Sequence, residues 1–262
     1  MTKIGIFARF GYPLPISERL QKIKQAGFEA VSLWWGDKEP DKNAQPELAQ
    51  KYGLVVDNVH APFDNANSLW DTASDGDSYI DMLIDCVRDC ERHGIPTVVI
   101  HLTRFSTPPP LAEIGLERVR RLVRFAEDRE INIAVENLSS PVHPDYIFQN
   151  ISSERLGFCY DSGHENYRSG VDYLSRYGQK LFAVHLHDNT GDSDAHLIPY
   201  HGTTDWNGVM RRLASSRQLE YLSLEVNFKN THPKSAAYSG LSADQYLSLC
   251  RDSALQLLAE TN

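Results

Sequence analysis

The hydrophobic residues of this chain gather in eight short runs separated by polar, helix-like segments. The runs are rich in Val, Ile, Leu, Phe and Trp and show little strict alternation, which is typical of strands buried on both faces of a parallel sheet. They are KIGIFARF (3–10), FEAVSLWW (28–35), GLVVDNVH (53–60), TVVIHL (97–102), INIAVEN (131–137), RLGFCYDSGH (155–164), LFAVHLHDN (181–189) and YLSLEVN (221–227).

Helical periodicity between these runs predicts helices over 17–25, 78–93, 111–129, 205–215 and 242–258. Asp205 and Ser242 are suitable N-caps, and Gly27 and Gly94 are suitable residues for ending a helix. Strands alternating with helices around eight runs predict an α/β fold, a (β/α)₈ barrel. Because such barrels typically contain about 250 residues, we expect residues 1–262 to form one domain.

The last six runs each carry, at the carboxyl end, a residue that can bind a metal ion. Parallel strands of a barrel present their carboxyl ends at one rim, where active sites lie. We therefore expect a metal site at this rim, supplemented by two residues of the loop after the seventh run. The candidate ligands are His60, His101, Glu136, Asp161, His164, His185 and Glu225, with Asp194 and His196 from the loop.

The candidate ligands fall into three groups. Three carboxylates and one imidazole suit Mn²⁺, Zn²⁺, Co²⁺ or Mg²⁺; they belong to Glu136, Asp161, His185 and Glu225. A second ion would be held by His60 and His101 with Glu136, and a third, most suited to Zn²⁺, by His164, Asp194 and His196. The sequence thus predicts one to three divalent ions.

The number of ions decides the chemistry. One divalent ion against the three carboxylates of the first group leaves a charge near −1, which favours a neutral polyol or sugar, whereas three ions against all four carboxylates leave about +2, which attracts phosphate. With one ion, Glu136 and Glu225 would flank a hydroxy-ketone and move a proton through an enediolate. With three ions, the same residues would activate a hydroxide for phosphoryl hydrolysis.

Composition and charge limit the kinds of binding partner that we expect. A formal net charge of −9 argues against a nucleic-acid partner, and the arginine run Arg118, Arg120, Arg121 and Arg124 is expected on a solvated, ion-paired helix face. We expect a cytoplasmic protein without a membrane span, and the sequence allows a homo-oligomer. The four cysteines are expected to be reduced thiols, with Cys86 and Cys90 facing the core.

Six motifs are together similar to those of one known superfamily. VHAP (59–62), VEN (135–137), CYDSGH (159–164), HLHDN (185–189), DAHLIPYHG (194–202) and LEVN (224–227) resemble the xylose isomerase-like TIM-barrel superfamily. It includes sugar phosphate isomerases/epimerases, ketose 3-epimerases, inosose and dehydroshikimate dehydratases, and AP endonuclease family 2, the endonuclease IV type. The resemblance runs from the first strand to the last.

The resemblance implies two ligand sets. The epimerase branch implies a metal held by Glu136, Asp161, His185 and Glu225, with the two glutamates as acid and base and His164 against the substrate. The endonuclease branch implies zinc ions on all nine candidate ligands. Its DNA-penetrating basic loops are missing, because the stretch 64–77 contains no Lys or Arg. The arginine that ketose epimerases place after the seventh strand is missing too, since Gly191 and Asp192 stand in that region.

We therefore expect a metal-dependent isomerase or epimerase of carbohydrate metabolism, acting on a small-molecule sugar or sugar phosphate. The alternatives are an endonuclease IV-like zinc phosphodiesterase and a non-catalytic metal- or sugar-binding barrel. One of Trp34 and Trp35 is expected to cover the pocket while the other packs outward. Further candidates for substrate binding, beside His164 and Trp34, are Arg104, Tyr200, Phe7 and Phe10.

Overall fold

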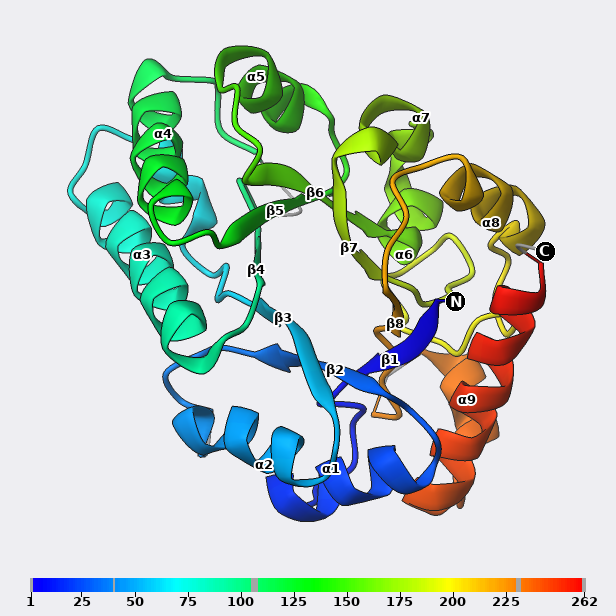
Figure 1. Cartoon of the computed structure of the whole chain (residues 1–262). Helices are drawn as coiled ribbons and strands as arrows, with labels where there is room; N and C mark the ends of the chain where they lie inside the picture. Colours follow the sequence, from blue (N-terminus) through cyan, green and yellow to red (C-terminus); the bar gives the residue numbers. More distant parts are fainter. Residues whose placement is uncertain (1, 40, 105–107, 230–231, 261–262) are drawn as a thin grey trace.

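Eight parallel strands form a barrel that is ringed by helices (Figure 1). This computed structural model describes residues 2–39, 41–104, 108–229 and 232–260. The strands are β1 (Lys3–Phe7), β2 (Ala30–Trp34), β3 (Val55–His60), β4 (Thr97–Ile100), β5 (Asn132–Glu136), β6 (Leu156–Asp161), β7 (Leu181–His185) and β8 (Tyr221–Leu224). Every neighbouring pair in the order β7-β6-β5-β4-β3-β2-β1-β8 is parallel, which confirms the predicted barrel.

The barrel closes between β7 and β8 only near their carboxyl ends. Leu186 N donates to Ser223 O and Glu225 N donates to Leu186 O, both at 3.0 Å, and Leu186 forms a parallel bridge with Leu224. These two bonds therefore bring the residues after β7 and β8 together at the same rim.

The five predicted helices are present, with shifted ends, as α1 (Ile16–Gln25), α3 (Asp75–His93), α4 (Glu113–Glu127), α8 (Trp206–Ala214) and α9 (Ala243–Ala259). The Asp205 carboxylate accepts a hydrogen bond from Gly208 N at the start of α8. Ser242 forms a capping box with Gln245 at the start of α9. Gly94 ends α3 in the left-handed conformation at φ 67°.

Shorter helices were not predicted. They are α2 (Gln45–Lys51), α5 (Val142–Asn150), α6 (Ser162–His164) and α7 (Tyr173–Tyr177), the 3₁₀ helices η1 (Lys42–Ala44), η2 (Ala66–Trp70), η4 (Gly178–Lys180) and η5 (Pro233–Tyr238), and the π-helix η3 (Glu165–Ser169). Except for α5, which is as long as α8, each is too short to show a clear hydrophobic period.

All four cysteines are buried free thiols, as expected. No helix among the described residues has the length and apolar character needed to cross a bilayer.

The expectation for the arginine run is wrong for Arg118. Its side chain is buried and donates hydrogen bonds to the carbonyls of Ser68, Leu69, Asp71 and Ala73. A helical wheel places Arg118 away from the barrel, but the loop before α3 folds back over this part of α4. The guanidinium therefore holds a loop rather than facing solvent.

Replacing Arg118 with Met should lower the free energy of unfolding by about 3 kcal/mol, because several buried carbonyls lose their donor. Urea denaturation measures the change. Arg121→Met is the matched control: its guanidinium is half exposed and pairs with Asp81, so the loss should stay within about 0.5 kcal/mol. Equal losses in the two variants would contradict the anchoring role of Arg118.

Asp57 of β3 accepts a hydrogen bond of 2.8 Å from the Ser223 hydroxyl of β8. Because β2 and β1 lie between these strands, the contact crosses the inside of the barrel. Gly5 of β1 leaves the room, since a Cβ there would lie 2.4 Å from the Ser223 oxygen. Burial raises the pKa of Asp57 to about 6, although the Ser223 hydrogen bond opposes the rise.

The folded protein therefore binds this proton more tightly than the unfolded chain, and Asp57 reduces stability as pH rises from 3.8 through about 6. Asp57→Asn should increase the free energy of unfolding at pH 7.5 by about 1–2 kcal/mol and make little difference near pH 3.5. Urea denaturation of both proteins at the two pH values measures the difference. A gain that is the same at both would contradict the assignment.

Candidate metal centre

The predicted ligands meet at the carboxyl ends of the strands. His60, Glu136, Asp161 and His185 are the last residues of β3, β5, β6 and β7. His101 and Glu225 directly follow β4 and β8. Because the register of a parallel barrel brings these ends together, side chains that are distant in sequence become neighbours.

Glu136 lies at the centre of the cluster and is 2% exposed. Its Oε2 lies 3.0 Å from His60 Nε2 and 3.1 Å from His101 Nε2. Its Oε1 lies 3.3 Å from His164 Nδ1 and 3.6 Å from His185 Nδ1. Burial alone would raise the pKa of Glu136, but the His101 and His185 imidazoles hold it well below its ordinary value. Glu136 is therefore an ionised carboxylate shared by two groups of ligands.

One such group, here called the inner quartet, consists of Glu136, Asp161, His185 and Glu225. Each offers one ligand atom, and these atoms lie within 4.8 Å of one another. Glu225 Oε2 lies 3.1 Å from His185 Nδ1. Burial opposes ionisation of Glu225, yet His185 and the neighbouring His196 lower its pKa to about 2.

The surroundings of His185 indicate whether the inner quartet is suited to a cation. Its side chain is fully buried, and neither ring nitrogen has a hydrogen-bond partner of good geometry among the described residues. Although burial opposes the rise, Cys159, Glu225 and Glu136 raise the pKa of this imidazole well above its ordinary value. A single proton then faces two ionised carboxylates, and the negative charge that remains favours a divalent ion. The quartet therefore fits a divalent ion with mixed nitrogen and oxygen ligands.

Three other imidazoles are oriented by backbone carbonyls. The Nδ1 atoms of His60, His164 and His196 lie 2.8, 2.9 and 2.7 Å from the carbonyl oxygens of Ala61, Asn137 and Glu225. A carbonyl only accepts, so Nδ1 carries a proton in each ring, and Nε2 is the atom that faces a carboxylate of the cluster. This arrangement is usual for metal-binding histidines, and His60 with His101 and Glu136 forms a second candidate group.

The third predicted group gathers around Asp194. Its Oδ2 lies 3.5 Å from His164 Nε2 and 3.3 Å from His196 Nε2. Burial lowers the pKa of an imidazole, but Asp194 outweighs it at His196 and raises its pKa to about 10. His196 has φ 42°, a left-handed conformation that is uncommon for a residue with a side chain. The structure thus brings all nine predicted ligands into one contiguous cluster, while their roles as ligands stay a prediction.

Two polar residues in this cluster were not predicted. Asn137 is fully buried and pairs with the backbone of Asp161, accepting from its N at 2.7 Å and donating to its O at 2.8 Å. His187 is also fully buried, with Nε2 3.2 Å from Asp161 Oδ2. Both stand in the quoted motifs VEN and HLHDN, so the signal was a polar residue inside an otherwise apolar strand end.

An aromatic wall borders the His60 side of the cluster. Trp34 lies with its ring 5.5 Å from that of His60, and Phe63 stacks on His101 at 4.2 Å. Trp35 is buried on the outer side, where its indole N–H donates to Asp89. The two tryptophans thus face opposite ways, as expected, and Phe63 is a member of the wall that was not predicted.

Two of the predicted substrate contacts lie away from the cluster. Phe10 is fully buried against Tyr12 and Tyr246, so its placement at the pocket is wrong. The Tyr200 hydroxyl donates to Glu260, just after α9. The end of α9 lies beside the beginnings of β7 and β8, so we no longer place Tyr200 in the site. The position of Tyr200 in the loop after the seventh strand did not indicate this hydrogen bond.

Arg104 lies on the β4–α4 loop, where its side chain donates to Asp64 O and its backbone N to Asn67. Phe7 is half-buried at the end of β1. Both stay predictions as substrate contacts.

Cys159 is a further neighbour of the inner quartet, because its sulfur lies within 4.8 Å of ligand atoms of Glu136 and His185. Burial raises the pKa of this thiol to about 12. It is therefore protonated at neutral pH and is a poor ligand beside the carboxylates.

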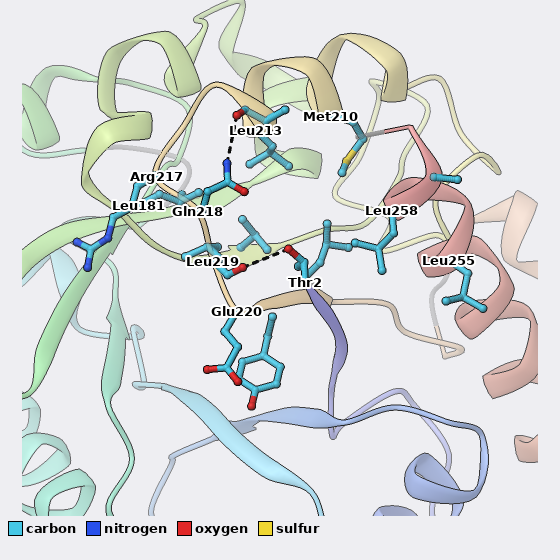
Figure 2. A pocket seen from close by; sticks show the side chains of 15 residues that line it. Thr2, Leu181, Met210, Leu213, Arg217, Gln218, Leu219, Glu220, Leu255 and Leu258 are labelled. Carbon is cyan, nitrogen blue, oxygen red and sulfur yellow. Dashed lines mark hydrogen bonds between the residues drawn. The ribbon is translucent and has the colours of Figure 1, made fainter. Parts of the chain in front are cut away.

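A cavity of about 800 Å³ lies at the other end of the barrel, where β7 and β8 begin (Figure 2). Its labelled side chains include Thr2, Leu181 and Leu219, with Met210 and Leu213 from α8 and Leu258 from α9. The rim opposite the carboxyl ends usually serves stability in such barrels, so we do not assign this cavity to the site.

The fold and the rim define an α/β barrel with a cluster of carboxylates and imidazoles at its carboxyl end. The sequence profile of the xylose isomerase-like TIM barrel matches residues 20–243, so the chain belongs to this family.

Relatives and solved structures agree with this membership. Fructoselysine 3-epimerase of Shigella flexneri is 22% identical over 249 residues, covering 86% of this chain and 90% of that protein. The uncharacterized protein y4fM of Sinorhizobium fredii (strain NBRC 101917 / NGR234) is 33% identical over 150 residues, which span 51% of this chain and about half (48%) of that relative.

Two solved structures share the fold over the whole chain. D-psicose 3-epimerase from Clostridium cellulolyticum H10, solved with D-tagatose, has a TM-score of 0.81 and 12% identity and covers 100% of both chains. The IOLI protein, solved with a zinc atom, has a TM-score of 0.79 and 16% identity and covers 100% of this chain and 99% of that one. At such identities the likeness shows the fold alone.

Because Glu136 is shared by two groups of ligands, Glu136→Gln should weaken binding of Zn²⁺ or Mn²⁺ at both by more than about tenfold. His60→Ala should weaken only the group formed with His101. Competition against a coloured chelator gives affinity and stoichiometry. His143→Ala is the control, since this buried imidazole lies in α5 and contacts Pro109 O. Unchanged binding in Glu136→Gln would contradict the central place of this carboxylate.

Proposed function

We propose that this protein is a metal-dependent sugar or sugar-phosphate epimerase or isomerase. The observation that carries the proposal is the position of His185 Nδ1. It lies 3.6 Å from the Oε1 atom of Glu136 and 3.1 Å from the Oε2 atom of Glu225. Two ionised carboxylates thus flank the place where the inner quartet would hold one divalent ion. The sugar epimerases among the relatives and neighbours support the same class of reaction.

Glu136, Asp161, His185 and Glu225 would hold the ion, which would polarise the carbonyl and hydroxyl oxygens of a hydroxy-ketone. One of the two glutamates takes the proton from the hydroxyl-bearing carbon next to the carbonyl, and the other returns a proton to that carbon from the opposite face. The low pKa of both carboxylates keeps them ionised in the metal-free protein, so the glutamate that returns the proton first takes it up from water. The Trp34 and Phe63 rings exclude water on the His60 side.

The alternative is a zinc phosphodiesterase of the endonuclease IV type. Assembly of all nine predicted ligands favours it, as do the imidazoles of His164 and His196 around Asp194. The β3–α3 loop opposes it, because 64–77 holds four aspartates and no Lys or Arg to meet a phosphate backbone.

Replacing Glu225 with Gln should lower epimerisation by about 10²- to 10⁴-fold, because an amide cannot exchange the proton. The assay follows deuterium incorporation from ²H₂O into D-tagatose, D-psicose and their phosphates, with Mn²⁺, Co²⁺ or Zn²⁺ supplied. Glu220→Gln is the control, since this exposed carboxylate pairs with Lys3 away from the rim.

Retention of full activity by Glu225→Gln would reject the paired-carboxylate mechanism. Cleavage of an oligonucleotide containing an abasic site, combined with about three zinc ions per chain and no deuterium exchange, would favour the phosphodiesterase. Metal binding without either reaction would favour a non-catalytic barrel.

A further inference from the structure

His187 occupies a place shaped for an imidazole between the inner quartet and Asp194. It lies two residues beyond β7 and is fully buried. Its Nε2 lies 3.2 Å from Asp161 Oδ2 and 3.6 Å from Asp194 Oδ1. Its ring stacks on that of His196 with centroids 4.0 Å apart and planes at 14°. Any side chain at Gly163 would collide with it, since a Cβ there would lie 1.9 Å from His187 Cε1.

The bonding of His187 is opposite to that of the backbone-oriented histidines. His60, His164 and His196 each have a carbonyl oxygen at Nδ1, so Nδ1 donates a hydrogen bond in each of these rings. At His187, Nδ1 is buried and has no hydrogen-bond partner in the part of the chain that the structure describes. Since both neighbours of Nε2 are carboxylates, which only accept when ionised, Nε2 is the nitrogen that carries the proton.

We infer that His187 is a positioning residue: its Nε2–H donates to Asp161 Oδ2 and fixes the orientation in which Asp161 binds the metal ion. Asp161 is then held on both sides. Its Oδ1 accepts from His164 N at 2.6 Å, and Asn137 pairs with its backbone. A carboxylate fixed in this way loses little conformational entropy when an ion binds.

This inference rests on the inner quartet of the proposed function, but not on its reaction. In this role His187 donates to a ligand rather than binding the ion, although a ring nitrogen of His187 lies within 4.8 Å of ligand atoms of His196 and Glu225. Loss of the N–H therefore differs from loss of a ligand, and an amide that offers an N–H at the same position should replace it.

The experiment compares His187→Ala with His187→Gln in the full chain, using Zn²⁺ or Mn²⁺ alone as the probe. His187→Ala should weaken binding by about 10- to 100-fold, while His187→Gln should recover all but a few-fold of the loss. His143→Ala, a buried histidine of α5, is the control and should bind as the original protein does. Circular dichroism checks that each variant is folded.

Two measurements do not depend on activity or on a bound ion. The imidazole ¹H–¹⁵N spectrum of the metal-free protein should contain a slowly exchanging Nε2–H that disappears in His187→Ala. Gly163→Ala keeps the imidazole but displaces it, so it should weaken ion binding as His187→Ala does. It replaces His187→Ala in the experiment if that variant does not fold.

Equal losses of ion affinity in His187→Ala and His187→Gln would mean that the ring itself binds the ion. Unchanged affinity in both variants would mean that His187 does not orient Asp161. Absence of the Nε2–H signal in the metal-free protein would also overturn the inference. A protein that binds Mn²⁺ with the expected dependence on His187 but exchanges no deuterium into any ketose would reject the proposed function and leave His187 in its role.

Discussion

The arrangement of the site depends on how the barrel is closed. The backbone of Leu186 makes one hydrogen bond in each direction with the strand end opposite it, at Ser223 O and Glu225 N. These bonds lie at the carboxyl end of the seam, whereas its other end borders a cavity. His185 and Glu225 are the residues on either side of this closure. A parallel barrel that closed elsewhere would not bring an imidazole of β7 within 3.1 Å of a carboxylate after β8.

The closure leaves a carboxylate buried at the rim, and neighbouring residues have to stabilise its charge. Glu136 is almost completely removed from water, and an isolated buried carboxylate would take up a proton. Four imidazoles, those of His60, His101, His164 and His185, surround it and keep it ionised instead. Backbone carbonyls orient two of these rings, those of His60 and His164, one step further out. The buried charge, its imidazoles and the carbonyls thus form three successive layers, each of which holds the next in place.

The strands and the principal ligands were predictable because each depends on local sequence: an apolar run and the polar residue that ends it. The rest depended on chain segments that return from a distance. Arg118 lies on the outer side of its helix and is nevertheless buried, because a loop from before α3 covers it. Tyr200 follows ligands in sequence, but its loop leads away to Glu260. His187 belongs to the motif HLHDN, but the sequence does not show that its ring packs against Gly163, where a Cβ would collide with it.

The balance of carboxylates and imidazoles differs between the candidate metal-binding groups, and so does the benefit of a bound cation. Around Asp194, one carboxylate faces His164 and His196, whose pKa values are raised, so protons alone can neutralise it. The inner quartet sets three carboxylates against the single imidazole of His185, and one proton cannot balance them. A divalent ion therefore lowers the free energy most at the inner quartet, and that group should fill first. Uptake around Asp194 must displace protons from His164 and His196, which makes it weaker as pH falls. A state with one ion in the inner quartet and protons around Asp194 follows from the same electrostatics. It is the state that the proposed reaction of a neutral sugar would require.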